Sequence, residues 1–147
     1  MYALKMRLKV IAILYKAIFI IFSVFIAILD LKTGMVPRIA FILALPLFFV
    51  LGLLQENYSL VMMIAGFLLG LIVFLLAFFV SGRKLGLADV WYSAIIGLAL
   101  GPVWWYAAIG CACVVGVLYM LISKRRKIPF IPFMALGSVI VSILDTI

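Results

Sequence analysis

Long apolar runs, separated by short charged or glycine- and proline-containing segments, dominate this chain. Each run is near the ~20 residues that cross a hydrocarbon core. The predicted spans are residues 10–29, 39–54, 59–80, 85–101, 103–123 and 128–144. The fourth and fifth are divided at Gly101-Pro102, because one undivided run there would be too long for a single crossing. The pattern predicts an all-α bundle of about six transmembrane helices, forming a single membrane domain over residues 1–147 without a soluble domain.

Composition supports the membrane interpretation. The chain has 147 residues, of which 71% are hydrophobic and only 11% charged. A soluble core of this size has no room for so much apolar surface, whereas a bilayer does. The net charge of +8 would suggest nucleic acid in a soluble protein. Here the bases lie in short loops, where they set topology and contact lipid headgroups, so we expect no nucleic-acid partner.

The N-terminal segment is expected to remain as an uncleaved helix, since no signal-peptidase site follows its apolar stretch. Lys5, Lys9 and Lys16 fall on one helical face. Residues 2–16 could therefore begin as an amphipathic turn on the membrane surface, with Lys16 reaching the headgroups.

Loop charge predicts the orientation. The loops after the first, third and fifth predicted spans carry all of the loop bases: Lys32, Arg38, Arg83, Lys84, Lys124, Arg125, Arg126 and Lys127. The positive-inside rule places these loops in the cytoplasm and both termini outside a plasma (inner) membrane.

The four acidic residues fall into two groups. Glu56 and Asp145 are expected to be solvated and structural. Asp30 ends the first span and Asp89 begins the fourth, so a six-helix count places both on one side of the membrane. Taken singly, Asp30 could be an interfacial residue that closes a helix, and Asp89 could be a helix N-cap.

Taken together, the two aspartates suit one chemistry. Neighbouring carboxylates in a partly dry site share a proton. The ionised member can then deprotonate a water while the protonated member hydrogen-bonds a peptide carbonyl. The chain has no histidine, and Cys111 and Cys113 lie inside an apolar run. We therefore expect no cofactor and no metal.

Three segments resemble those of the prepilin peptidases (type IV leader peptidases), a family of GxGD-type membrane aspartyl proteases. Residues 30–37 resemble D-x-[KR]-x-x-x-[IV]-P, residues 86–89 stand where the family has G-x-G-D, and residues 128–133 resemble its P-F-x-P segment. The segments occur in family order along the whole chain. Ala88 replaces the second motif glycine, Trp91 a frequent lysine, and Arg38 a frequent asparagine.

The resemblance implies an intramembrane-edge aspartic endopeptidase in which Asp30 and Asp89 are catalytic. It would remove the basic leader of membrane-anchored prepilin-like (or archaellin-like) precursors at the cytoplasmic face, in pilus assembly or protein secretion. It also implies a short, peptidase-only member without methyltransferase activity. The residues expected to support the motif or the substrate site are Lys32, Pro37, Gly86, Ala88, Pro129, Phe130 and Pro132.

Two alternatives remain open at the level of sequence. One is a small ion- or proton-coupled transporter using Asp30 and Asp89, and the other is a non-catalytic assembly subunit. Two further features are expected to be structural. Gly66 and Gly70 would permit close helix packing, and the cluster at residues 104–106 would form an interfacial aromatic belt.

Overall fold

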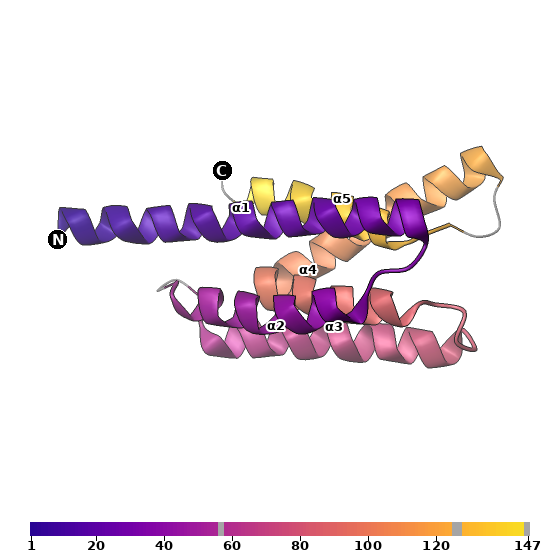
Figure 1. Cartoon of the computed structure of the whole chain (residues 1–147), viewed down its shortest axis with the longest axis horizontal. Helices are drawn as coiled ribbons and strands as arrows, with labels where there is room; N and C mark the ends of the chain where they lie inside the picture. Colours follow the sequence, from indigo (N-terminus) through magenta and orange to yellow (C-terminus); the bar gives the residue numbers. More distant parts are fainter. Residues whose placement is uncertain (56–57, 125–127, 146–147) are drawn as a thin grey trace.

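The computed structural model describes residues 1–55, 58–124 and 128–145, and every regular element within these ranges is helical. The helices are α1 (Tyr2–Thr33), α2 (Arg38–Leu53), α3 (Leu60–Val80), α4 (Leu87–Ser123) and α5 (Ile131–Leu144) (Figure 1). The all-α prediction is therefore confirmed. The described residues form five helices and not the predicted six, because α4 includes both the fourth and the fifth predicted spans.

A break divides α4 at the predicted boundary. Gly101 has φ 78° and ψ 173°, a backbone conformation that essentially only glycine adopts. Pro102 follows it and has no N–H to continue the helical hydrogen bonds. The two halves of α4 consequently run in different directions on either side of the break (Figure 1).

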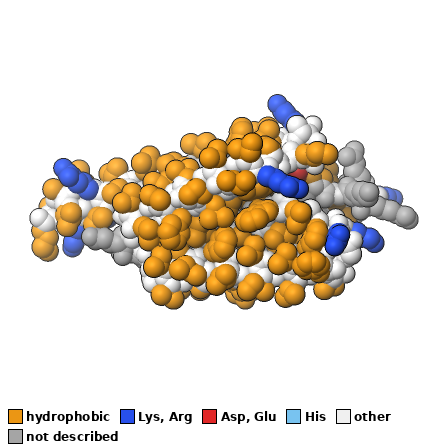
Figure 2. Space-filling model, turned by 60° about the horizontal axis from the view of Figure 1, so that its bottom comes forward, with side chains coloured by type: hydrophobic (Ala, Val, Ile, Leu, Met, Phe, Trp, Pro, Cys, Tyr) orange, Lys and Arg blue, Asp and Glu red, His pale blue; other side chains and the backbone are white. Residues whose placement is uncertain are grey.

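Helix length and surface character are those of a membrane protein. Among the described helices, α1, α3 and α4 are long and apolar enough to cross a bilayer, and α2 and α5 are shorter apolar helices. Figure 2 shows hydrophobic side chains over most of the visible face, with lysines and arginines gathered toward its two ends. This pattern fits lipid around the middle of the bundle and water or headgroups at its ends.

Small residues bring the helices together. A Cβ at Gly66 of α3 would collide with the Gly97 carbonyl of α4, and one at Gly70 with the Ser93 carbonyl. In the same way Gly137 of α5 lies against Ala108 of α4. The predicted role of Gly66 and Gly70 in close packing is thus confirmed. The main packing partner of α1 among the described helices is α5.

Three predicted boundaries differ from the structure by three residues or more, and one of them is the end of the first helix, which lies at Thr33 and not at Leu29. The first helix begins at Tyr2 and not near residue 10, and residues 2–16 continue it without interruption, so the separate surface turn is not formed (Figure 1). The last helix begins at Ile131 and not at Ile128. Pro129 lies just before that start, where a residue preceding proline is biased away from helical geometry.

Candidate functional site

The end of α1 and the beginning of α4 lie at the same end of the bundle (Figure 1). This arrangement follows from the chain path, in which α1 and α3 both run toward that end and α4 starts there. Four of the predicted loop bases are exposed near these helix ends. Lys32 lies in the last turn of α1 and Arg38 begins α2, whereas Arg83 and Lys84 lie between α3 and α4. The turn between α3 and α4 is tight, since Gly82 and Arg83 both have positive φ.

Asp30 lies in the last turn of α1 and is only 8% exposed. Its backbone carbonyl accepts a hydrogen bond of 2.9 Å from the N–H of Gly34. Gly34 has φ 64°, the left-handed conformation that commonly ends a helix. The helix therefore stops within one turn of Asp30, and the side chain is turned toward the bundle and away from solvent.

Asp89 lies in the first turn of α4 and is 7% exposed. It is not the N-cap considered above, because Gly86 occupies that position. The Gly86 N–H donates a hydrogen bond of 3.1 Å to the Asp89 Oδ2. The Oδ1 is buried and has no hydrogen-bond partner in the described part of the chain. One oxygen is thus held by the backbone, and the other remains available as an acceptor.

The two carboxyl groups belong to the last turn of α1 and the first turn of α4, and these two helix ends lie at the same end of the bundle (Figure 1). Both are mostly buried, so water screens their interaction less than it would at an exposed surface. Two like charges in such a place are costly, and the usual outcome is that the pair holds one proton between its members. The arrangement can therefore present a carboxylate base and a carboxylic acid at one site.

Gly86 and Ala88 support the Asp89 carboxylate differently. A Cβ at residue 86 would lie 3.1 Å from the Asp89 Oδ2, tighter than ordinary packing. Ala88, in contrast, is partly buried and packs against the hydrophobic core. Its methyl group, a departure from the family motif, therefore has a place in this fold. Trp91 is 41% exposed on the same helix.

Within the described ranges, Lys32 and Pro37 form no hydrogen bond or ion pair with the two carboxyl groups. Lys32 is exposed in the last turn of α1, and among the described residues it forms no ion pair with Asp30 or Asp89. Pro37 is the N-cap of α2. The two residues therefore flank the segment that joins α1 to α2.

The third predicted segment has a packing role in the structure. Pro129 is exposed, Phe130 is the N-cap of α5, and Pro132 lies in the first turn of that helix. The Phe130 ring packs against Phe74 of α3 with centroids 6.3 Å apart. No hydrogen bond or ion pair in the described ranges joins these residues to Asp30 or Asp89.

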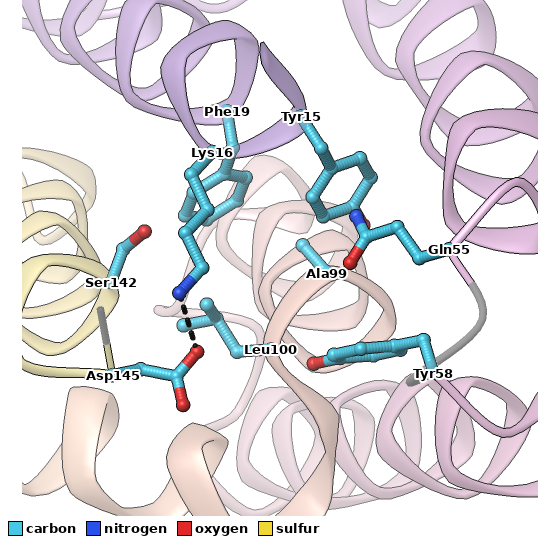
Figure 3. Close-up of a pocket in the computed structure, with 9 residues that line it drawn as sticks. All are labelled: Tyr15, Lys16, Phe19, Gln55, Tyr58, Ala99, Leu100, Ser142 and Asp145. Carbon is cyan, nitrogen blue, oxygen red and sulfur yellow. Dashed lines mark hydrogen bonds and ion pairs between the residues drawn. The ribbon is translucent and has the colours of Figure 1, made fainter. Parts of the chain in front are cut away.

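A small pocket, whose lining does not include Asp30 or Asp89, lies between Lys16 of α1, Tyr58 before α3 and Asp145 after α5 (Figure 3). Its volume is about 10 Å³, room for roughly one water molecule and far too little for a peptide. Lys16 and Asp145 close one side of it with an ion pair of 2.8 Å. Asp145 is exposed, as predicted, and the ion pair that it forms with Lys16 is a contact that the sequence did not predict.

Two predicted features, Glu56 and the bases at positions 125–127, lie outside the described residues.

The prediction of an interfacial aromatic belt is wrong for Trp105, which is 2% exposed. Its indole Nε1–H donates to the Ser93 carbonyl and hydroxyl oxygens, at 3.2 and 3.0 Å. The described residues contain no group of three or more His, Cys, Asp or Glu side chains that could hold a metal.

Sequence reasoning did not single out Tyr92, which lies three residues after Asp89 and is completely buried. Two serines on other helices, Ser23 and Ser138, are also completely buried. These residues could have been identified in the sequence as single hydroxyl side chains inside apolar runs. A polar group is costly within a membrane helix, so such residues often have a structural or functional role.

Comparison with known families adds one match. The model of the type IV leader peptidase family matches residues 17–121, a range that includes both aspartates and the segment joining α3 to α4. No curated protein and no solved structure shows significant similarity to the chain.

Proposed function

The chain belongs to the type IV leader peptidase family, and we propose that it is an aspartic endopeptidase that uses Asp30 and Asp89. One observation carries this proposal. Two mostly buried aspartates, one in the last turn of α1 and one in the first turn of α4, lie at the same end of the bundle (Figure 1), and Asp89 keeps an oxygen without a partner among the described residues. The family match favours a peptidase over the ion-transport alternative.

The proposed mechanism needs only the two carboxyl groups and a water molecule. The ionised carboxylate removes a proton from water, and the water oxygen forms a bond to the peptide carbonyl carbon. The protonated carboxyl group donates its proton to the carbonyl oxygen. The tetrahedral intermediate then collapses, the C–N bond breaks, and the carboxyl group that took the water proton passes a proton to the leaving amine. The hydroxyl proton of the intermediate returns to the other carboxylate.

Geometry supports Asp89 as the more firmly held member. The Gly86 N–H fixes its Oδ2, so the buried Oδ1 has a defined direction in which to contact water or substrate. Asp30 is positioned by the end of α1, which Gly34 terminates one turn later. Either residue can act as the base, because the proton belongs to the pair.

The proposed substrate is a membrane-anchored, prepilin-like precursor with a basic leader. Its apolar helix would lie in the bilayer beside the bundle, and its leader would be cleaved at the cytoplasmic edge of the plasma membrane. Exposed bases at the aspartate end of the bundle support this orientation, because cytoplasmic loops are enriched in lysine and arginine. The aspartates lie at a helix end and a helix start, where a cleavage site next to the membrane would be reached.

The test is cleavage of a co-expressed precursor in a host strain that lacks its own prepilin peptidase. We expect the wild-type chain to shorten the precursor, and Asp30→Asn and Asp89→Asn each to lower cleavage by about 10²–10⁴-fold. Both substitutions keep side-chain size and remove the charge.

The matched control is Asp145→Asn, which removes an acid at the far end of the bundle. We expect it to retain cleavage while all variants insert to the same level. Cleavage by Asp30→Asn and Asp89→Asn at the wild-type rate would exclude the proposed mechanism.

A further inference from the structure

Buried hydrogen bonds join the two halves of α4 to each other and to α3. The Ser93 hydroxyl donates to the Gly70 carbonyl oxygen of α3 at 3.2 Å. The Trp105 indole Nε1–H donates to the hydroxyl and the carbonyl oxygens of Ser93, at 3.0 and 3.2 Å. Ser93 lies before the break at Gly101, and Trp105 lies after it. The indole therefore bonds across the break.

These bonds lie where water does not compete with them. Ser93 is 0% exposed and Trp105 is 2% exposed. The Ser93 hydroxyl is used both as a donor and as an acceptor. Gly70 leaves room for the indole, since a Cβ there would lie 3.0 Å from the Trp105 Nε1. Buried polar groups are costly when unpaired, so the paired arrangement is favoured over one in which the two halves of α4 turn apart.

The backbone at the break does not fix the angle between the two halves by itself. Gly101 can adopt a wide range of φ and ψ, and Pro102 has no N–H to bond the preceding turn. Side-chain contacts must therefore hold the angle. Trp105 lies about one turn after the break and Ser93 about two turns before it, so their bonds brace the break from within the bundle.

Aromatic packing also holds the indole. The rings of Trp105 and Phe74 of α3 are in edge contact, with centroids 6.3 Å apart. Phe74 in turn packs against Phe130, the N-cap of α5, at the same centroid distance of 6.3 Å. The segment that resembles P-F-x-P is thus linked to Ser93 through Phe74 and Trp105, although it does not bond the aspartates.

The angle at the break matters to the two aspartates because different parts of the molecule hold them. Asp89 lies in the first half of α4, about one turn before Ser93. Asp30 ends α1, whose main packing partner among the described helices is α5. The second half of α4 lies against α5, where Gly137 meets Ala108. A change of angle at the break therefore shifts α5 and α1 relative to Asp89.

A direct contact also joins α1 to the first half of α4. The Phe22 and Tyr92 rings lie with centroids 6.5 Å apart. An apolar ring contact is less directional than a hydrogen bond, so it constrains the angle between helices less strictly.

We propose that the Trp105 indole N–H is a positioning group for the aspartyl pair: by bonding Ser93, it fixes the angle between the two halves of α4 and so the placement of Asp89 relative to Asp30. The effect on catalysis rests on the proposed peptidase function, whereas the effect on geometry does not. Trp105 acts through the position of Asp89 and is not itself a catalytic residue.

Two substitutions test the proposal. Trp105→Phe removes the N–H, and Ser93→Ala removes the hydroxyl group with little change in volume. We expect each to lower kcat for leader cleavage by roughly tenfold with little change in KM, as a displaced catalytic group predicts. Because both remove a shared bond, the loss in the double variant should be smaller than the product of the single losses. Losses that multiply, or an unchanged kcat in Ser93→Ala, would overturn the proposal.

The matched control is Trp104→Phe. Trp104 is the neighbouring residue of α4, but it is 37% exposed and takes no part in the bonds to Ser93. This substitution should leave kcat and KM near the wild-type values. Equal losses for Trp104→Phe and Trp105→Phe would show that the bonds across the break are not responsible.

A distance measurement separates this proposal from the proposed function. In a chain carrying Cys111→Ala and Cys113→Ala, spin labels on Lys32→Cys and Trp91→Cys report the separation between the end of α1 and the first half of α4. Both labelled positions are exposed, and pulsed electron paramagnetic resonance gives the distribution of distances without any substrate.

We expect added Trp105→Phe or Ser93→Ala to broaden or shift this distance distribution, and added Trp104→Phe to leave it unchanged. If the wild-type chain cleaves no precursor, the peptidase assignment fails, and the distance distributions still decide whether Trp105 positions the helices. Identical distributions in all of these chains would contradict that role.

Discussion

At the scale of single residues, the backbone hydrogen bond to Asp89 is the most specific feature of the site. The Gly86 N–H fixes one carboxylate oxygen and leaves the other unpaired. A side chain at residue 86 would press against the fixed oxygen. The glycine is therefore needed for the position of the carboxylate more than for the conformation of the turn, since its own φ of −73° is open to any residue.

Gly86→Ala is accordingly expected to lower leader cleavage by roughly tenfold, because a small displacement of a catalytic group is costly. Stability should fall by no more than about 1 kcal/mol, the range of a glycine-to-alanine change at a helix N-cap. Steady-state cleavage and thermal unfolding of the purified variant measure the two effects. Gly110→Ala is the control, since its added methyl meets open space. Wild-type cleavage by Gly86→Ala would contradict this account of the carboxylate.

The sequence was informative about the aspartates and much less so about what surrounds them. The order of the apolar runs predicted that Asp30 and Asp89 lie at the same end of the bundle. Asp30 ends the first run and Asp89 begins the fourth, and these two positions fall on the same side of the membrane. The pairing of Lys16 with Asp145 was missed because these residues are 129 positions apart. Such a contact depends on how α5 returns along α1, which no local pattern specifies. The buried indole of Trp105 was missed for the same kind of reason.

At the scale of helices, the break in α4 decides where its second half goes. A continuous helix of 37 residues would be about 55 Å long, well beyond the ~30 Å of a hydrocarbon core. The Gly101-Pro102 pair turns the chain so that the second half lies against α5 (Figure 1). The sequence predicted this position from glycine and proline alone. It could not show that the helix breaks without an intervening loop, which depends on the φ of a single glycine.

Gly101→Ala is expected to destabilise the bundle by about 1–3 kcal/mol, because alanine is strained at φ 78° and ψ 173°. The added methyl would also approach the Tyr58 hydroxyl at 3.4 Å. Thermal unfolding in a mild detergent measures the loss. Gly110→Ala lies in the same helix with open space beside it, and it should be neutral or slightly stabilising. A Gly101→Ala variant as stable as Gly110→Ala would show that the break does not require glycine.

At the scale of the whole molecule, the bundle has two chemically different ends. Asp30, Asp89 and the exposed bases of the interhelical turns lie at one end. The N-terminus and the end of α5 lie toward the other. Length and composition were enough to predict a helical membrane bundle. The precise number of separate helices was not predictable, because a kinked helix and two helices joined by a tight turn have the same hydrophobic pattern.

The proposed orientation can be tested by labelling single cysteines in membrane vesicles. In a chain with Cys111→Ala and Cys113→Ala, Lys32→Cys and Lys84→Cys should react with an impermeant maleimide from the cytoplasmic face, and Lys5→Cys from the opposite face. The physical reason is the excess of bases on the turns at the aspartate end. Labelling of Lys32→Cys and Lys84→Cys from opposite faces would contradict the arrangement of α1, α3 and α4 across the membrane.

The central claim is that Asp30 and Asp89 act together as one catalytic pair. The most direct measurement is the initial rate at which the purified chain, reconstituted in lipid, removes the leader of a purified precursor. The account predicts cleavage by the wild type and by Asp145→Asn. It also predicts that Asp30→Asn and Asp89→Asn each lose about 10²–10⁴-fold, and that the double variant loses no more than the more severely affected single one. Losses that simply multiply in the double variant, or full activity in either single variant, would contradict a shared catalytic role.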